Sequence, residues 1–231
     1  MSDLRVSLFF PVFRDERSVR TVAEKALRLL PELCSDYEII IVDDGSPDRS
    51  GAIADELARE HAAIRVIHHE TNRGYGAAVR SGIAAARGEW VFFTDGDGQF
   101  DPAILPDVVQ TLGDADAVVG WRATRADTWR RRAFTRSWNA LVRRLLGVPV
   151  RDVNCAVKLF RRRLVDDGAL RADGGAISAE LLAHLVRQGA RVVELPVPHL
   201  PRRAGRASGG SPRVALKAFT ELAAVWWRFR A

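Results

Sequence analysis

The sequence has few cysteines and no long uninterrupted apolar run. Its only two cysteines, Cys34 and Cys155, lie far apart and lack the spacing of metal ligands. Such a pair cannot build a disulfide framework, so we expect two buried thiols in a reducing compartment. No window reaches the roughly 18 uncharged residues of a membrane-spanning helix, because residues 214–229, the best candidate, contain three charged residues.

A secretory signal is also missing, because the short apolar run at residues 8–12 is cut by Pro11 and follows no basic segment. We therefore expect a cytoplasmic protein whose membrane contact, if any, is peripheral. The chain has 35 Lys+Arg against 29 Asp+Glu, a formal net charge of +6. This balance favours an anionic partner: a nucleic acid, a membrane surface or a phosphorylated small molecule.

Strand and helix patterns alternate along most of the chain. Each expected strand is a short apolar run, and each expected helix repeats apolar residues at helical spacing. Such alternation predicts an α/β fold with a parallel sheet covered on both faces, in which ligands bind beyond the carboxyl ends of the strands. The expected strands are residues 6–10, 37–42, 64–68, 90–93, 117–119 and an edge strand from 192. The expected helices are residues 18–33, 50–61, 103–112, 177–188 and 214–229, together with an Ala-rich helix that residues 72–76 lead into and that ends at residue 86.

The stretch WVFFTDGDGQFDP, residues 90–102, is the most informative segment. A buried strand ends there in two carboxylates one residue apart, Asp95 and Asp97, followed by the amide of Gln99. These oxygen ligands favour Mg²⁺ or Mn²⁺ over zinc. An isolated Asp-Gly-Asp-Gly is more often a simple turn. However, the polar clusters at residues 13–16 and 43–46 also follow strands, so three clusters converge on one rim and favour the metal site.

The Gly74-x-Gly76 element does not predict a dinucleotide-binding fold. It lacks the third glycine of that fingerprint and follows the third strand rather than the first. We interpret it as a tight turn that lets a helix start close to a nucleotide.

Four segments together carry a resemblance to a known family. They are PVFRDE (11–16), VDDGSPD (42–48), NRGYGAAVRSG (72–82) and TDGDGQFDP (94–102). In this order and spacing the chain resembles the family 2 glycosyltransferases, and among them the polyprenyl-phosphate sugar synthases, over about residues 5–210. The resemblance implies a GT-A domain with a mixed, mostly parallel sheet at residues 1–210 and a C-terminal amphipathic helix at 211–231. It also implies inverting transfer of a hexose from GDP- or UDP-hexose to a polyprenyl phosphate at the inner face of the membrane.

The resemblance also implies roles for individual residues. The metal ion that the resemblance implies, Mg²⁺ or Mn²⁺, would be held by Asp95, Asp97 and Gln99. Gly96 would help to hold the diphosphate. Pro11, Phe13 and Asp15 would line the base and ribose, and Val42 and Asp44 would hold the base and sugar of the nucleoside. Phosphates would be met by Arg122, Arg131, Arg202 and Ser208, and Asp97, Arg122 and Arg202 would act in catalysis.

The sequence departs from the family pattern at several of these places. Phe13 stands where a tyrosine is usual, and Tyr75 stands where many relatives have lysine. Ala156-Val157-Lys158 replaces the usual Gly-Phe-Arg, which keeps the basic charge and loses the glycine. The lid segment near Arg202 lacks its usual lysine.

Several residues and segments allow more than one interpretation. Asp152 either contacts the sugar or the acceptor loop, or caps a helix. Glu180 either faces the site or is a surface glutamate. The basic, tryptophan-bearing run at residues 125–138 is an acceptor loop with interfacial helices, a solvated helix, or, less favoured, a nucleic-acid patch. The C-terminal helix lies in a membrane interface, on a partner or on its own core.

Two other functions compete with transfer to a lipid phosphate. A sugar-hydroxyl acceptor is the main alternative and would need a protein base. A non-catalytic nucleotide-sugar or nucleic-acid binder is disfavoured, because the intact set of Asp95, Asp97 and Gln99 would have no role in it.

Overall fold

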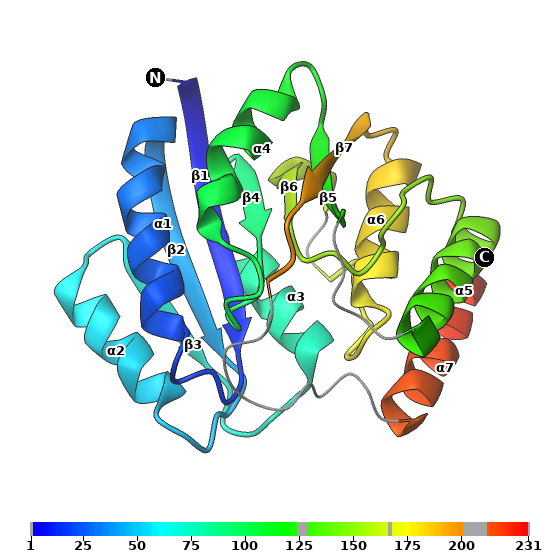
Figure 1. Cartoon of the computed structure of the whole chain (residues 1–231), viewed down its shortest axis with the longest axis horizontal. Helices are drawn as coiled ribbons and strands as arrows, with labels where there is room; N and C mark the ends of the chain where they lie inside the picture. Colours follow the sequence, from blue (N-terminus) through cyan, green and yellow to red (C-terminus); the bar gives the residue numbers. More distant parts are fainter. Residues whose placement is uncertain (1, 124–128, 166–167, 201–211, 231) are drawn as a thin grey trace.

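The computed structural model describes residues 2–123, 129–165, 168–200 and 212–230 (Figure 1). Strands and helices alternate along the chain as the sequence patterns predict. The strands are β1 (Ser2–Val12), β2 (Cys34–Asp43), β3 (Ile64–His68), β4 (Trp90–Phe93), β5 (Ala117–Arg122), β6 (Lys158–Arg161) and β7 (Val192–Val197). The α-helices are α1 (Val19–Leu33), α2 (Ser50–Glu60), α3 (Tyr75–Ala85), α4 (Leu105–Leu112), α5 (Trp129–Leu146), α6 (Ile177–Arg187) and α7 (Pro212–Arg228).

All seven strands form one sheet in the order β3-β2-β1-β4-β6-β5-β7. The pairs β1–β2, β2–β3, β1–β4 and β5–β7 are parallel, whereas β6 runs antiparallel to both of its neighbours. The carboxyl ends of six strands therefore lie at one edge of the sheet, which is at the bottom of Figure 1. Because β6 is reversed, its first residue, Lys158, lies at that same edge, paired with Phe93 and Val119.

Helices cover the sheet on both faces, because its central strands are apolar on both sides. Helices α1, α2 and α4 pack together on one face, and α3 and α6 lie on the other, with α5 and α7 packed outside α6. Gly82 shows how closely α3 approaches β1, since a Cβ atom at this position would lie 2.2 Å from the Phe9 ring. The core is continuous from Val6 in β1 to Leu222 in α7.

The structure confirms the expected α/β class and the mixed, mostly parallel sheet that the resemblance implies. The antiparallel strand β6 was not among the expected strands, because its four residues carry a basic side chain at each end and lack an alternating pattern. The edge position expected for the strand from residue 192 is confirmed, since β7 ends the sheet.

The C-terminal helix α7 packs against α5 and α6, and its Leu222 and Val225 are buried. The domain boundary expected at 210/211 lies outside the described residues and stays a prediction. Both cysteines are buried free thiols, as expected. In the described part of the chain, no helix combines the length and apolar character needed to cross a bilayer.

Candidate active site

The three polar clusters meet at the carboxyl edge of the sheet. Gly96 lies so close to the end of β1 that an added Cβ atom would be 2.7 Å from the carbonyl oxygen of Pro11. Ser18 Oγ donates to the Gly96 carbonyl oxygen at 2.8 Å, and the Asp44 N–H donates to the Val12 carbonyl oxygen at 3.1 Å. Segments far apart in the sequence are thus joined by direct contacts.

The segment after β4 presents Asp95, Asp97 and Gln99 at this edge. Tyr75, the first residue of α3, donates its hydroxyl to Asp95 Oδ1 at 2.9 Å. The Gln99 N–H donates to Asp97 Oδ1 at 2.9 Å, and Gln99 Nε2 donates to the Leu200 carbonyl oxygen at 3.3 Å. Because its amide nitrogen is engaged in this way, Gln99 keeps its side-chain oxygen as an acceptor for a ligand.

The electrostatics of this pair favour a cation. Burial, followed by the negative charge of Asp97, raises the pKa of Asp95 to about 7. Burial and the nearby carboxylates also raise the pKa of the Tyr75 phenol, so it keeps its proton and remains a donor. Two crowded carboxylates with an amide oxygen fit Mg²⁺ or Mn²⁺, which would remove their mutual repulsion. In the described ranges no cluster of three or more His, Cys, Asp or Glu side chains forms a more complete metal centre.

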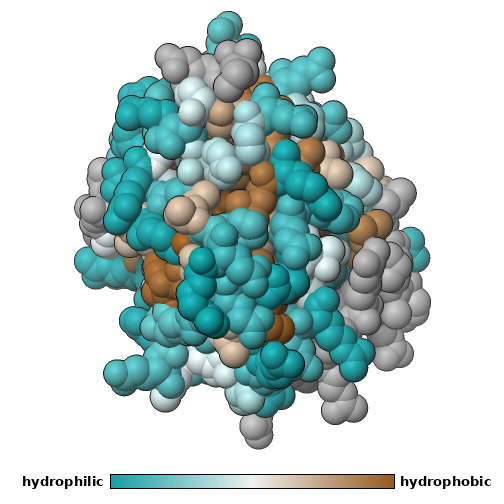
Figure 2. All heavy atoms as spheres, turned by 90° about the vertical axis from the view of Figure 1, so that its left-hand side faces the viewer, coloured by the Kyte–Doolittle hydropathy of each residue, from teal (hydrophilic) through white to brown (hydrophobic). Residues whose placement is uncertain are grey.

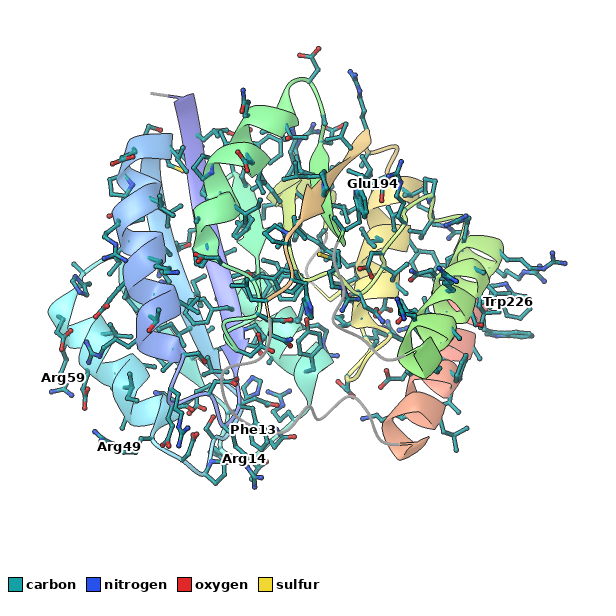
Figure 3. All side chains as sticks on the ribbon, in the orientation of Figure 1. Phe13, Arg14, Arg49, Arg59, Glu194 and Trp226 are labelled. Atoms are coloured by element: carbon teal, nitrogen blue, oxygen red, sulfur yellow. The ribbon has the colours of Figure 1, made fainter. Side chains whose placement is uncertain are left out.

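The residues expected at the base and ribose occupy two different environments. Phe13 and Arg14 lie at the lower edge of the molecule, beyond β1 (Figure 3). Asp15 turns back, and its Oδ2 accepts the Phe13 N–H at 3.0 Å. Pro11 and Val42 are instead buried, and Val42 has no exposed surface.

Asp44 is occupied by the protein itself. Its Oδ2 accepts from Asn72 Nδ2 and the Gly74 N–H, each at 2.9 Å. Its Oδ1 accepts from the Arg73 N–H at 2.9 Å and lies 2.7 Å from His69 Nδ1. Only 4% of this side chain is exposed. The geometry assigns Asp44 to fixing the turn that precedes α3, whereas its expected contact with the nucleoside stays a prediction.

Arg122 and Asp152 form a bidentate ion pair at the end of β5. Arg122 Nε lies 2.7 Å from Asp152 Oδ2 and Nη2 lies 2.8 Å from Oδ1, and the side chains are 11% and 3% exposed. The Arg122 N–H also donates to Asp152, at 3.3 Å. Asp152 therefore holds an arginine at the rim, a role that neither sequence interpretation included.

Glu180 is a buried residue of α6 with both carboxylate oxygens engaged. Its Oε2 accepts the N–H groups of Arg171 and Ala172 at 2.9 and 2.8 Å. Its Oε1 accepts Arg228 Nη2 of α7 at 2.5 Å. The surface-glutamate interpretation is wrong, because only 1% of the residue is exposed.

Three expected phosphate contacts cannot be located in this site. Arg202 and Ser208 lie outside the described residues. Arg131 belongs to α5, but its side chain is not among those described.

Lys158 and Tyr75 are site residues that sequence reasoning did not assign. Both were visible as departures from the family pattern, but their contacts depend on the fold. Lys158 is 1% exposed, and its ammonium donates to the Cys155 carbonyl oxygen and lies 5.5 Å from the centre of the Phe93 ring. Burial lowers the pKa of Lys158 to about 8, although Cys155, Asp152 and Asp95 oppose that shift.

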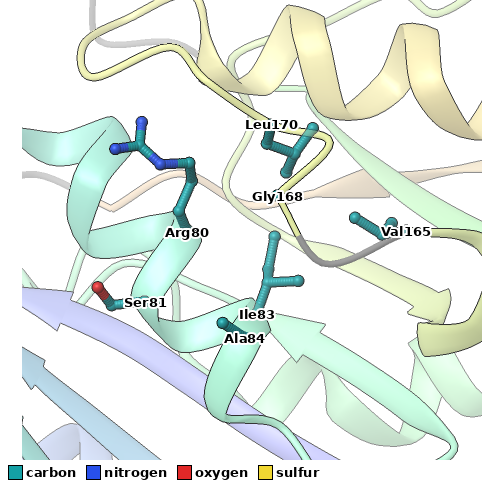
Figure 4. A pocket seen from close by; sticks show the side chains of 7 residues that line it. All are labelled: Arg80, Ser81, Ile83, Ala84, Val165, Gly168 and Leu170. Atoms are coloured by element: carbon teal, nitrogen blue, oxygen red, sulfur yellow. The ribbon is translucent and has the colours of Figure 1, made fainter.

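A separate cavity of about 240 Å³ lies between α3 and the segment that precedes α6 (Figure 4). None of the expected site residues lines it. Its wall is formed by Arg80, Ser81, Ile83, Ala84, Val165, Gly168 and Leu170.

Comparison with known sequences decides the family. The sequence model described as "Glycosyl transferase family 2" matches residues 7–169, which hold every segment of the rim from β1 to β6. The chain belongs to glycosyl transferase family 2.

Two curated relatives of this chain act on lipid phosphates, according to their names. A dodecaprenyl-phosphate galacturonate synthase of Rhizobium johnstonii is 32% identical over 92% of this chain and 64% of its own length. An undecaprenyl-phosphate 4-deoxy-4-formamido-L-arabinose transferase of Proteus mirabilis is 31% identical over 87% of this chain and 61% of its own. The chain thus spans less than two thirds of the length of these relatives.

Solved structures share the fold. Glucosyl-3-phosphoglycerate synthase from Mycobacterium tuberculosis, in complex with Mn²⁺, UDP-glucose and phosphoglyceric acid, superposes with a TM-score of 0.74 at 20% identity. The match covers 96% of this chain and 80% of that one. At this identity the likeness establishes the GT-A fold alone.

The buried ammonium of Lys158 predicts an unusual dependence of stability on pH. Its folded pKa of about 8 lies below the ordinary lysine value of about 10.4, so between these values the unfolded chain binds more protons. The free energy of unfolding should therefore rise with pH across this window through Lys158. Relative to Lys158→Met, the wild type should gain on the order of 1 kcal/mol between pH 7.5 and 9.5 in urea denaturation. Parallel pH profiles would contradict this assignment.

Proposed function

We propose that this chain is the catalytic domain of an inverting glycosyltransferase that moves a hexose from a nucleoside diphosphate to a polyprenyl phosphate. A phosphate oxygen of the acceptor forms the new bond to the anomeric carbon, while the bond from that carbon to the donor diphosphate breaks. The nucleoside diphosphate leaves with the bonding electron pair. The observation that carries the proposal is the set Asp95, Asp97 and Gln99 at the carboxyl edge of a family 2 fold.

A divalent cation, Mg²⁺ or Mn²⁺, would neutralise the charge that develops on the leaving diphosphate. Asp95, Asp97 and the side-chain oxygen of Gln99 would hold it. The Mn²⁺ bound by the structural relative supports this assignment without deciding between the two metals.

The acceptor is inferred from the state of the acidic residues. A hydroxyl acceptor needs a carboxylate or imidazole that can take its proton, whereas a phosphate monoester is largely ionised at neutral pH. Asp152 is held in a bidentate pair by Arg122, and Glu180 is buried beneath Arg228 with two backbone N–H groups on its second oxygen. Neither candidate base is poised to accept a proton, which favours a lipid phosphate. The names of the curated relatives agree with this choice.

The donor side is assigned to the rim that follows β1 and β2. Phe13 and Asp15 would meet the base and ribose of a UDP- or GDP-hexose. Asp44 would act there through the backbone turn that it fixes. Arg122, fixed by Asp152, would meet a phosphate, a contact in which the guanidinium geometry matters as much as its charge.

We further propose that the chain binds peripherally to the cytoplasmic face of the membrane through α5 and α7. Four of the five large apolar side chains that are exposed among the described residues lie on these helices: Phe134, Leu216, Phe219 and Trp227. Helix α5 contains no acidic residue, and the only one in α7, Glu221, points inward to the Ala176 N–H. Basic and aromatic side chains together fit an anionic lipid surface.

The opposite face of the molecule has a different character. The face that carries α1 and α2 is largely hydrophilic (Figure 2). Arg49, which precedes α2, and Arg59 on α2 are exposed there, and Trp226 lies on α7 on the other side (Figure 3).

The acceptor assignment is tested by single-turnover kinetics with a panel of UDP- and GDP-hexoses and radiolabelled polyprenyl phosphate. We expect transfer to the lipid, with Asp152→Asn and Glu180→Gln keeping a substantial fraction of the chemical rate. A loss of about 10³-fold in either variant, rescued at higher pH or by an added base, would identify a hydroxyl acceptor instead. If none of the donors supports transfer, the proposed enzymatic function is wrong.

The metal assignment is tested by Asp97→Ala and by EDTA. The variant should lose turnover by orders of magnitude while keeping its thermal midpoint, since Asp97 lies at a solvent-facing rim. EDTA should abolish activity, and Mn²⁺ or Mg²⁺ should restore it. Asp107→Ala on α4, which removes an exposed carboxylate that is not a proposed metal ligand, serves as control. Full activity in EDTA would exclude the cation from the mechanism.

The membrane assignment is tested by cosedimentation with vesicles that contain anionic lipid. Replacing Arg136 and Arg144 on α5 by alanine should lower the partition coefficient at least about tenfold, because each arginine near such a surface contributes about 1 kcal/mol. Replacing Arg49 and Arg59, at the start of α2 and within it, by alanine changes the net charge equally and should have little effect. Equal losses in both double variants would mean that binding follows net charge and not this face.

A further inference from the structure

Tyr75 lies outside the 94–99 segment, and its side chain donates a hydrogen bond to a proposed metal ligand. Its hydroxyl lies 2.9 Å from Asp95 Oδ1. Its ring packs at a tilt on Phe93, with 6.2 Å between the ring centres. The phenol is therefore held at both ends, by the last residue of β4 and by the carboxylate that follows it.

The backbone around Tyr75 is fixed from two sides. Asp44 accepts the N–H groups of Arg73 and Gly74, which sets the turn on the β2 side. On the α6 side the Gly76 N–H donates to the Asp173 carbonyl oxygen at 2.8 Å. Such contacts on both flanks leave the start of α3 little freedom to shift.

Both flanking glycines are required by this fit. Gly74 has φ of 98°, a region that side chains disfavour, and an added Cβ would lie 2.6 Å from the Asp173 carbonyl oxygen. A Cβ at Gly76 would lie 2.3 Å from the Ala172 carbonyl oxygen. Tyr75 is therefore the one side chain between the two glycines, and it points at the carboxylate.

The carboxylate that it meets needs such a donor. Asp95 lies one residue from Asp97, and without a partner the repulsion between them would favour rotation of one side chain away from the other. A hydroxyl on Oδ1 fixes the plane of the Asp95 carboxylate. Donors of this kind, behind the atoms that bind a metal, set the orientation of the ligand and the affinity of the site.

We propose that Tyr75 is a positioning residue for the metal and diphosphate site: its hydroxyl holds Asp95 Oδ1 and turns Oδ2 towards the cation. This inference rests on the proposed function, because it needs a cation between the rim and the diphosphate. In this role Tyr75 couples cation binding to nucleotide binding.

The test compares Tyr75→Phe with Tyr37→Phe, a substitution of the only other tyrosine, which lies in β2 opposite Val6. Both changes remove one hydroxyl and keep the ring. Binding of UDP and of GDP is measured by calorimetry with and without Mn²⁺, and Mn²⁺ binding is measured independently by the electron paramagnetic resonance of the free ion.

Tyr75→Phe should lower the Mn²⁺-dependent nucleotide affinity about tenfold or more, leave metal-free affinity unchanged, and keep the thermal midpoint of the wild type. Tyr37→Phe should match the wild type throughout. Unchanged Mn²⁺-dependent binding in Tyr75→Phe would overturn the inference while leaving the metal site intact. An equal loss with and without Mn²⁺ would also overturn it, as a general defect of the site. If the wild type itself shows no Mn²⁺-dependent binding, the metal assignment fails first and the inference with it.

Discussion

The burial of Asp95 next to Asp97 at the end of a strand is the constraint on which the site depends. Burial, followed by the negative charge of Asp97, makes Asp95 costly to keep ionised, and the raised pKa of Asp95 expresses that cost. The surrounding structure offsets this cost in two ways. The Tyr75 hydroxyl donates to Asp95 at 2.9 Å, and the positive charges of Lys158 and Arg122 favour the ionised form of Asp95. A divalent cation would complete this compensation.

Positively charged side chains lie close to the acidic residues of this edge. Lys158 is the first residue of β6, the one antiparallel strand, so it lies at the edge where the other strands end. Arg122 ends β5 and is paired with Asp152. The reversal of a single strand thus places the ammonium of Lys158 at the acidic edge.

The loop before α6 connects the rim to the C-terminal helix. Ala172 and Asp173 support the turn that carries Tyr75, and Glu180 holds the N–H groups of Arg171 and Ala172. Glu180 in turn accepts from Arg228 of α7. The helix proposed to lie on the membrane is therefore joined by hydrogen bonds to the segment that shapes the proposed metal site.

The sequence by itself determined the α/β class, the strand-end position of Asp95, Asp97 and Gln99, and the family, because strand and helix periodicity and short motifs are local properties of the chain. It did not determine β6, whose four residues carry two basic side chains and become a strand only between β4 and β5. It also left Asp152 and Glu180 open, since a carboxylate at a rim and one buried under an arginine look alike in sequence. Only the tertiary structure decided these roles, because the partners lie 30 residues away for Asp152 and 48 for Glu180, and their distances depend on how the sheet and helices pack.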